Sequence, residues 1–399
     1  MSNLYAALEI GTTRTVLAIG EGDATGRLKV SCHAEIPSTG VRKSQILDIN
    51  QATQSIRSVL HAIERKQDEL GSHITLGNAF LLVNGQHVKA DAAQGMAQIS
   101  GKVGTEEIDE VLRSARAVPI ARDRELLDIV DQDYELDTLA GISNPKGMTG
   151  HILRLNTLQI HADRDRIQNA RTAAESAHLE IREPLFAATC AAEAVLEDHE
   201  KKNGVLVLDL GGGSTGYAVY IDGFLVTAGV IGVGGDHITN DIAQAFQTTN
   251  AQAEGLKINE ASATIGTADG ASARVKVEQG ENTLMDTRTI SRHALDTVVN
   301  ARVLELFTII RETLEDADLL HRLHSGVVLT GGGARLRDLD RIAGETLNMN
   351  VRIGRPINID GLDDEDFPAG FAAIAGALLY ANRNYEEKSL FDGFRRLFK

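Results

Sequence analysis

The sequence predicts an α/β protein whose two related halves face each other across a cleft, with a small α+β insertion in the first half. The chain has 399 residues. One hydrophobic core usually serves no more than roughly 250–300 residues, so at least two domains are expected. A strand, a turn of small residues and a second strand occur at residues 4–20 and again at 204–221, which indicates an internal duplication. A third glycine turn, Gly331-Gly332-Gly333, follows another apolar strand.

The first half begins with a hairpin and continues with a helix and a buried strand. Leu4–Ile10 and Thr15–Gly20 are short apolar runs joined by Gly11-Thr12-Thr13, which is the pattern of a β-hairpin. Over Asn50–Leu70, apolar residues recur every three or four positions among polar ones, and this spacing predicts an amphipathic helix. The run Ala79–Asn84 (AFLLVN) predicts a strand buried in a sheet.

The pattern of the sequence changes between residues 85 and 162, where we expect the insertion. An acidic helix over Glu106–Ala117 is followed by a turn-rich stretch and by a strand over Gly150–Ala162. Two helices are then expected, Asp165–Ala177 and the alanine-rich Pro184–Asn203, before the second half begins.

The second half repeats the opening of the first. A strand over Gly204–Leu210, a turn at Gly211–Ser214 and a strand over Tyr217–Ile221 form its hairpin. The other elements expected are strands over Ala273–Glu278 and Asn282–Ile290, a helix over Asp296–Leu314, a strand over Gly326–Thr330, and helices over Leu336–Leu347 and Gly370–Ala381. Each half therefore places one small-residue turn at the same point of its fold.

Composition and charge predict an acidic cytoplasmic protein. The chain has 40 Lys and Arg against 56 Asp and Glu, a net charge of −16, which argues against nucleic acid as a partner. The two cysteines provide neither a disulfide framework nor a zinc cluster, and Cys190 is expected to be a small core residue. The N-terminus has no basic region before Glu9, and no stretch approaches the ~20 apolar residues of a transmembrane helix, so we expect neither signal peptide nor membrane span.

The glycine turns indicate phosphate binding. Backbone amides exposed at such a turn form a concave anion site, and glycine lets a phosphate approach closely. Turns from two related hairpins would clamp a phosphate chain from both sides, and the neighbouring carboxylates of Glu9 and Asp209 suit Mg²⁺ with its waters. The sequence has no G-x-x-x-x-G-K-[ST] motif, and Gly211-Gly212-Gly213 opens no helix, which argues against a Walker A loop and a Rossmann dinucleotide site.

Three segments resemble the nucleotide-binding motifs of the actin, Hsp70 and sugar-kinase superfamily. Leu8–Arg14 (LEIGTTR), Leu208–Thr215 (LDLGGGST) and Leu329–Ala334 (LTGGGA) are similar to its phosphate-1, phosphate-2 and adenosine motifs. Within it the chain resembles the FtsA family of bacterial cell-division actins: Gly147–Gly150 (GMTG) introduces the strand that closes the family's subdomain 1C, and residues 232–243 (GVGGDHITNDIA) are similar to its segment after phosphate 2. The resemblance covers essentially the whole chain and implies an actin-like, ribonuclease H-like duplicated fold with an ATP cleft between its halves.

The resemblance implies ATP and Mg²⁺ as ligands and a set of residues that contact them. The residues expected at the nucleotide are Gly11, Thr12, Thr13, Arg14, Asp209, Gly211, Gly212, Gly213, Ser214, Gly234, Gly235, Lys257, Gly331, Gly332 and Gly333. Glu9 and Asp209 are expected to hold the metal through water. The subdomains implied are 1A at residues 1–84 and 163–203, 1C at 85–162, 2A at 204–235 and 322–360, 2B at 236–321, a return helix to 1A at 361–381, a linker at 382–387 and a membrane-targeting helix at 388–399.

Three residues depart from the family's motifs, and two of them, Glu9 and Gly216, lower the ATPase activity that we expect. Glu9 stands where the family usually has Asp, Gly216 stands where an Asp is common, and Arg14 replaces the usual Lys. Glu9 moves the charge by one methylene and Gly216 removes a carboxylate, whereas the planar fork of Arg14 still suits a phosphate. We therefore expect an intact phosphate cradle with slow hydrolysis at most, and we assign no catalytic residue.

The resemblance also implies protein partners. The C-terminal peptide of FtsZ is expected on subdomain 2B at Arg288 and Arg302, since arginine forks form bidentate bonds with the carboxylates of an acidic peptide. The family further implies self-association into filaments and recruitment of later divisome proteins. The resulting prediction is a protein that tethers the FtsZ ring to the cytoplasmic face of the membrane at the division site.

The last residues, Lys388–Lys399, predict an amphipathic helix on an anionic membrane surface. Basic residues flank an apolar stripe with the spacing i, i+1, i+4, i+7 and i+8. The stripe consists of Leu390, Phe391, Phe394, Leu397 and Phe398, and the basic residues beside it include Arg395 and Arg396. A terminal helix folded back on its own core would show the same pattern, and the family resemblance favours the membrane.

Two other functions are compatible with parts of the pattern. A pilus-assembly adaptor of the PilM type would account for the insertion but not for the basic terminal helix. An exopolyphosphatase also carries a D-x-G-G-G-S-T turn, but a Glu follows it where Gly216 stands here. A sugar kinase would need a catalytic Asp in a substrate pocket, and the sequence offers no candidate.

Overall fold

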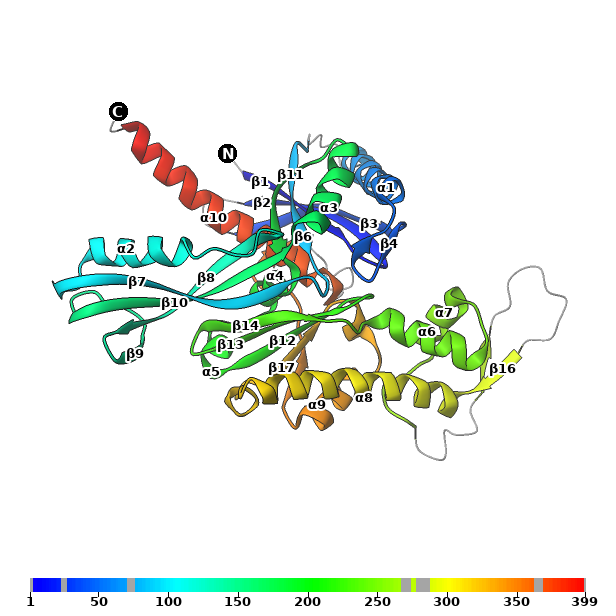
Figure 1. Cartoon of the computed structure of the whole chain (residues 1–399). Coiled ribbons are helices and arrows are strands. Elements are labelled where there is room, and N and C mark those ends of the chain that lie inside the picture. The colour runs from blue at the N-terminus through cyan, green and yellow to red at the C-terminus, as the bar shows by residue number, and fades with distance from the viewer. Residues whose placement is uncertain are drawn as a thin grey trace.

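A computed structural model of the chain describes residues 3–22, 27–69, 76–266, 274–277, 288–361 and 369–397, with the backbone alone for Arg288, Ala369 and 385–397. It confirms the α/β class. Two mixed sheets form the two halves, and an antiparallel sheet forms the insertion (Figure 1).

The two large sheets have the same topology, which confirms the duplication. In each, an antiparallel meander of three strands is extended by two parallel strands on the side of its first strand. The first sheet runs in the order β11 (Glu180–Phe186), β6 (Asn78–Val83), β1 (Asn3–Ile10), β2 (Arg14–Gly22), β3 (Leu28–Pro37) and β19 (Ile359–Asp360). The second runs in the order β14 (Phe224–Ile231), β13 (Thr215–Ile221), β12 (Val205–Leu210), β17 (Val327–Thr330) and β18 (Val351–Ile353).

The helices pack around these sheets and agree with most of the predicted ranges. They are α1 (Ile49–Glu69), α3 (Arg164–Ser176), α4 (Ala187–Val195), α5 (Asp198–Asn203), α6 (Gly235–Phe246), α7 (Asn250–Asn259), α8 (Arg292–Asp316), α9 (Leu339–Leu347) and α10 (Ala372–Leu397), with 3₁₀ turns at Leu320–Arg322, Gly332–Arg335 and Ala369–Phe371. Of the two strands expected near residues 273–290, the structure describes β15 (Arg274–Val277) and β16 (Arg288–Ser291), and residues 278–287 lie outside the described part.

The insertion extends from the first half as an arm with a core of its own (Figure 1). Its sheet runs in the order β7 (Lys89–Lys102), β10 (Thr149–Asp163), β8 (Arg124–Leu136) and β9 (Leu139–Ile142), and α2 (Thr105–Arg116) covers β7. Val111 and Ala115 of α2 and Leu153 and Leu155 of β10 are fully buried together. This separate cluster explains why the pattern of the sequence changes over this segment.

Residues Pro184–Asn203 do not form the single helix that the sequence predicted. Pro184 lies in β11, an edge strand, where the missing amide of proline is tolerated. The following helices α4 and α5 are separated because Leu196 and Glu197 are extended.

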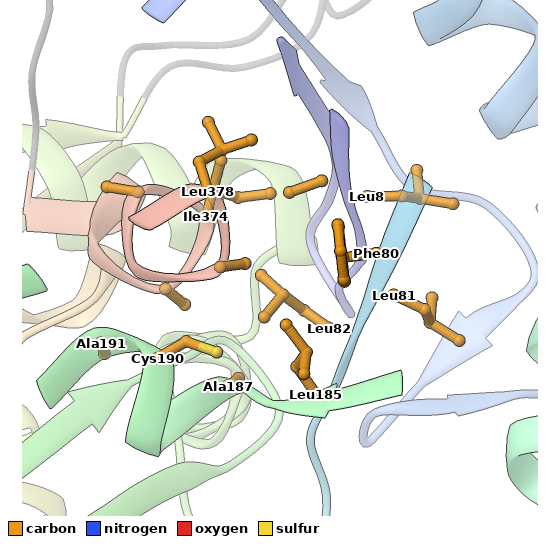
Figure 2. Packing of buried hydrophobic residues seen from close by; sticks show 14 of the residues in the cluster. Leu8, Phe80, Leu81, Leu82, Leu185, Ala187, Cys190, Ala191, Ile374 and Leu378 are labelled. Carbon is orange, nitrogen blue, oxygen red and sulfur yellow. The ribbon is translucent and has the colours of Figure 1, made fainter. Parts of the chain in front are cut away.

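The first half is held together by α10 packing against α4. Ile374 and Leu378 of α10 lie over Ala187, Cys190 and Ala191 of α4 (Figure 2). Cys190 is 5% exposed, and burial raises the pKa of its thiol, so it is the small core residue that the sequence predicted. The contact is close because Gly376 faces the backbone of α4, and a Cβ there would overlap the carbonyl oxygen of Cys190.

Replacing Gly376 with valine is expected to lower the free energy of unfolding by about 2–3 kcal/mol, because the side chain would force the two helices apart. Urea denaturation measures the change. Gly255→Val is the matched control: Gly255 lies inside α7, and a Cβ added there would meet nothing within 4 Å. The control should be neutral or slightly stabilising, since valine is a better helix former than glycine. Equal stability of the two variants would contradict this packing.

The end of α10 differs from the prediction. The helix continues through residues 382–387, where a linker was expected. Arg383, Glu386 and Glu387 in this segment are good helix formers, and no proline or glycine interrupts it. The predicted membrane residues Leu390, Phe391, Phe394, Arg395, Arg396 and Leu397 lie where only the backbone is described, and Phe398 lies outside the described residues. No helix in the described part of the chain is both long and apolar enough to cross a bilayer.

Candidate nucleotide site

The turns of the two duplicated hairpins have the same backbone geometry. The amide of Gly11 donates to the carbonyl of Arg14 at 3.0 Å, and the amide of Gly211 donates to the carbonyl of Ser214 at 3.0 Å. We call residues 11–14 the first phosphate loop and residues 211–214 the second. The amides of Thr12, Thr13, Gly212 and Gly213 donate to no acceptor among the described residues. Each loop therefore presents two backbone donors that an anion could use.

The two loops touch each other across the junction of the halves. A Cβ on Gly213 would lie 2.5 Å from Oγ1 of Thr12, and a Cβ on Gly212 would lie 2.6 Å from Cγ2 of Thr13. A side chain at either position would force the threonine of the opposite loop to move, so glycine lets the two loops lie in contact. The hairpins are thus placed to hold one ligand from two sides.

Two adjoining cavities flank the loops. The inner one, of about 100 Å³, is lined by both loops, Glu9, Asp209 and the third glycine turn, and the outer one, of about 390 Å³, is lined by Lys257, Leu336 and other residues of the second half. Thr13, Arg14, Gly211, Gly212 and Gly332 line both. We call the pair the cleft. All fifteen residues predicted at the nucleotide line it: Gly11, Thr12, Thr13, Arg14, Asp209, Gly211, Gly212, Gly213, Ser214, Gly234, Gly235, Lys257, Gly331, Gly332 and Gly333.

The third glycine turn joins the loops at the centre of the cleft. Gly331 has a φ of +81°, and a Cβ there would lie 2.5 Å from Oδ1 of Asp209. Gly332 faces open space, since a Cβ added to it would meet nothing within 4 Å. The turn continues as a 3₁₀ turn, and α9 begins at Leu339, three residues later than predicted.

Glu9 and Asp209 occupy equivalent positions, each two residues before its phosphate loop. Burial raises the pKa of Glu9 to about 7, against a lowering effect of Arg14, and burial raises the pKa of Asp209 to about 6. Neither carboxylate receives a hydrogen bond or an ion pair from any described residue. Two unpaired carboxylates in a buried cleft fit Mg²⁺, which takes few protein ligands when phosphate and water supply the others. The described residues hold no group of three metal-ligating side chains, so the protein alone provides an incomplete shell.

These pKa shifts predict that Glu9 and Asp209 destabilise the nucleotide-free protein increasingly as the pH rises. The ordinary pKa values are 4.5 for Glu9 and 3.8 for Asp209, so between about pH 4 and pH 7 the folded state binds more protons than the unfolded chain. Stability from these groups is therefore present at low pH and lost as the pH rises through that window. The stability of Glu9→Gln relative to the unsubstituted protein should grow with pH, which melting temperatures across the window would measure. A constant difference would refute the assignment.

Gly216, one of the departures from the family's motifs, has a structural reason. It lies on β13, opposite Asp209, and a Cβ there would be 2.9 Å from Cβ of Ala188 on α4. An aspartate at this position would have to displace α4. The cleft therefore lacks the extra carboxylate because α4 occupies its place.

Arg14 is already engaged, which the sequence did not predict. Its guanidinium donates to Oε2 of Glu35 at 2.7 Å and to the carbonyl oxygen of Gly370, and it lies 5.3 Å from the ring centroid of Phe371. A phosphate would have to share or displace these contacts. In this conformation Arg14 ties β2 to β3 and to the segment before α10.

Lys257 belongs to a polar cluster with Thr239 and Glu254, which the sequence did not predict. Its ammonium donates to Oε2 of Glu254 at 2.7 Å, to Oγ1 of Thr239 at 2.9 Å and to the carbonyl of Gly235 at 3.2 Å. The lysine is thus fixed at the start of α6, on the wall of the outer cavity. Its contacts are not those of a solvated surface lysine.

Of the two arginines predicted to bind a peptide, the structure describes the side chain of Arg302 alone. Arg302 on α8 donates to both carboxylate oxygens of Asp241 at 2.6 and 2.9 Å, contacts Glu305, and lines the outer cavity. It is therefore a paired residue of the cleft wall and not a free surface cation. The backbone of Arg288 pairs with that of Val277 where β15 and β16 run antiparallel, and its side chain lies outside the described part.

A further element of the inner cavity had no signal in the sequence analysis. The two-residue strands β4 (Val41–Arg42) and β5 (Gln45–Ile46) form a small hairpin whose residues line this cavity together with Asn84 and His87. Burial lowers the pKa of His87 to about 4, so it is neutral at physiological pH. Strands this short leave no alternation that a sequence pattern could reveal.

Comparisons with known proteins agree with this architecture. A family model described as "Cell division protein FtsA" matches residues 206–375, and one described as "SHS2 domain inserted in FTSA" matches residues 85–161. Cell division protein FtsA of Pseudomonas aeruginosa is 32% identical over 379 residues, covering 94% of this chain and 89% of the relative. Cell division protein FtsA of Escherichia coli K12 is 30% identical over 390 residues, covering 96% and 91%.

Solved structures show the same fold at lower identity. A chain of the PilM–PilN type IV pilus biogenesis complex has a TM-score of 0.62 and 18% identity, covering 95% of this chain and 98% of the other. MreB 5 of Spiroplasma citri bound to AMPPNP has a TM-score of 0.56 and 14% identity, covering 98% and 99%. The near full-length identity to FtsA proteins, the inserted domain and the duplicated fold lead to one conclusion. The chain belongs to the FtsA family, and it is a cell-division protein with an actin-like fold.

Proposed function

We propose that this protein binds ATP with Mg²⁺ in the cleft and uses the nucleotide as a conformational switch while it tethers the FtsZ ring to the membrane. One observation carries the nucleotide part: two equivalent loops, each preceded by a carboxylate, face each other across the halves. A ligand that touches both loops couples its own state to the angle between the halves. The MreB 5 neighbour was solved bound to AMPPNP, which supports a nucleotide in a cleft of this fold.

In this proposal the inner cavity binds the phosphates and the metal, and the outer cavity binds the base. The free amides of both phosphate loops would donate to phosphate oxygens, and Glu9 and Asp209 would orient metal-bound water. Mg²⁺ would supply neutralisation of the phosphate charge. In the outer cavity, Ile238, Leu306 and Leu336 provide apolar surface for a base, beside the fixed Lys257. Hydrolysis is expected to be slow, because Gly216 stands on β13 at the position where the family commonly has a further carboxylate.

The membrane part of the proposal depends on charge and periodicity at the end of the chain. The whole protein carries a net charge of −16, so an anionic bilayer would repel its body, whereas the last twelve residues, Lys388–Lys399, are locally basic. An apolar stripe flanked by arginines is typical of a helix that lies in the membrane interface. We propose that residues 388–399 are this anchor, with filament formation and divisome recruitment as further properties of the protein.

Co-sedimentation tests the proposed function as a whole. FtsZ should pellet with anionic vesicles when this protein, ATP and Mg²⁺ are present, and stay in solution when the protein is omitted or lacks residues 388–399. Vesicles of neutral lipid are the control for charge. If the protein pelleted with the vesicles but left FtsZ in solution, the tethering function would be wrong.

We also propose that the acidic tail of FtsZ binds at Arg288 and Arg302. The ion pair between Arg302 and Asp241 provides a direct test. If the acidic tail of FtsZ takes Arg302 from Asp241, then Asp241→Asn should raise the affinity for a tail peptide, since a neutral amide holds the guanidinium less strongly than a carboxylate. Arg288→Glu combined with Arg302→Glu should lower it roughly tenfold or more. Fluorescence anisotropy of a labelled peptide measures both, with ATP affinity as the control for folding. Unchanged peptide affinity in the double variant would remove this site.

A further inference from the structure

The tip of the β4–β5 hairpin reaches from the first half into the junction of the two phosphate loops. Its base is fixed to the first half, where the amide of Leu47 donates to the carbonyl of Gly40 at 2.8 Å. At its tip, the amide of Ser44 donates to Oγ1 of Thr12 at 2.8 Å, and the hydroxyls of Ser44 and Ser214 lie 3.1 Å apart. Ser44 therefore contacts both loops at once, one from each half of the protein.

The tip is held close to the second loop in a conformation that ordinary residues rarely adopt. Lys43 and Ser44 have φ values of +50° and +57°, the left-handed region that favours glycine in a two-residue turn. A Cβ on Gly213 would lie 2.9 Å from Cα of Lys43 and 3.2 Å from the amide nitrogen of Ser44. Glycine at 213 thus lets the hairpin tip approach the second phosphate loop to contact distance.

Hydroxyl groups at the hairpin tip have hydrogens that are free to donate. Thr12, Ser44 and Ser214 contribute three hydroxyl groups, and the hydrogen bond between Ser44 and Ser214 uses one hydroxyl hydrogen. Oγ1 of Thr12 acts only as an acceptor, so two hydroxyl hydrogens have no acceptor among the described residues. A phosphate oxygen accepts hydrogen bonds and donates none, so it complements this cluster.

We propose that Ser44 is a donor to the terminal phosphate of the nucleotide and so lets the protein distinguish ATP from ADP. This rests on the proposed nucleotide function. Ser44 lines the inner cavity with Glu9 and Asp209 and is absent from the outer cavity, where the base would lie. A phosphate chain that runs inward from the outer cavity places its last phosphate at Ser44. Ser44 belongs to the first half and also contacts Ser214 of the second half. Binding of the terminal phosphate therefore affects contacts in both halves.

The test is the affinity of the full-length protein for fluorescent ATP and ADP analogues with Mg²⁺, before and after Ser44→Ala. ATP affinity should fall roughly tenfold, the usual value of a hydrogen bond to a charged group, while ADP affinity stays within about twofold. Ser31→Ala is the matched control, because that hydroxyl donates to the carbonyl of Ile19 on β2 and lines neither cavity. It should leave both affinities unchanged.

Ser44→Gly is a second variant that tests the same hydroxyl in case Ser44→Ala fails to fold. Glycine adopts the left-handed turn without strain and also lacks the hydroxyl. It should show the same selective loss of ATP affinity together with a higher melting temperature. Equal losses for ATP and ADP, or no loss in either variant, would overturn the role of Ser44 and leave the nucleotide site standing. If the unsubstituted protein bound neither analogue, the proposed nucleotide function itself would fail.

Discussion

Replacing Phe394 with glutamate is expected to release the protein from anionic vesicles while leaving ATP affinity unchanged. Phe394 lies at the centre of the apolar stripe over Leu390–Phe398, so the substitution places a charge where the helix would meet the acyl chains. Full burial of one such side chain is worth up to ~1.5–3 kcal/mol, so its loss alone should weaken binding roughly tenfold or more. Vesicle sedimentation over a range of lipid concentrations measures the effect.

A single anchor should bind weakly, which makes the substitution easy to detect. The anchor residues continue α10, and a helix in the membrane interface buries its apolar stripe only partly, so one copy gains less than full burial of those side chains would give. Stable attachment then requires many anchors acting together, as a filament would provide. The effect of Phe394→Glu should therefore be amplified in assembled protein.

Ser389→Glu is the matched control for this prediction. It adds the same charge within the same twelve residues, but at helical spacing it lies on the face opposite Phe394. Ser389→Glu protein should sediment with anionic vesicles nearly as well as the unsubstituted protein. If Phe394→Glu protein sedimented equally well, the terminal helix would have to pack on its own domain and the anchor would be wrong.

Replacing Gly332 with valine is expected to abolish tight ATP binding without unfolding the protein. Gly332 lines both cavities, faces open space, and has no left-handed φ that a side chain would strain. The valine side chain would therefore enter the cleft and take the volume that a nucleotide needs. A loss of tenfold or more is expected, since each 1.4 kcal/mol of lost contact is a factor of about ten.

Titration calorimetry with ATP and Mg²⁺ measures this loss, and the melting temperature confirms the fold. Gly266→Val provides a control at another exposed glycine with open space around it, outside both cavities. Unchanged ATP affinity in a folded Gly332→Val protein would remove the nucleotide from this cleft.

The sequence predicted the fold and the cleft because their signals are local. Each hairpin is a strand, a small-residue turn and a strand within about twenty residues, and its repetition alone indicated the duplicated halves. Twelve of the fifteen proposed nucleotide residues lie in three short motifs, and the family resemblance supplied Gly234, Gly235 and Lys257. All fifteen line the cleft. Local motifs carry such information because loop backbone geometry is set by neighbouring residues.

What the sequence could not predict depends on contacts between distant residues. The ion pairs of Arg14 with Glu35 and of Arg302 with Asp241 join residues 21 and 61 positions apart, so no local pattern shows that these cations are already paired. Residues 382–387 were expected to be a linker because they are polar. Polar residues such as Arg and Glu are also good helix formers, so composition alone does not distinguish a linker from the continuation of a helix.

Structure determination of the protein with Mg²⁺ and a non-hydrolysable ATP analogue tests the central claim most directly. The phosphate chain should lie between residues 11–14 and 211–214, within hydrogen-bond distance of the amides of Thr12, Thr13, Gly212 and Gly213, with the base in the outer cavity beside Lys257. An analogue bound elsewhere, or phosphates that contact only one of the two loops, would contradict the account of a nucleotide switch between the halves.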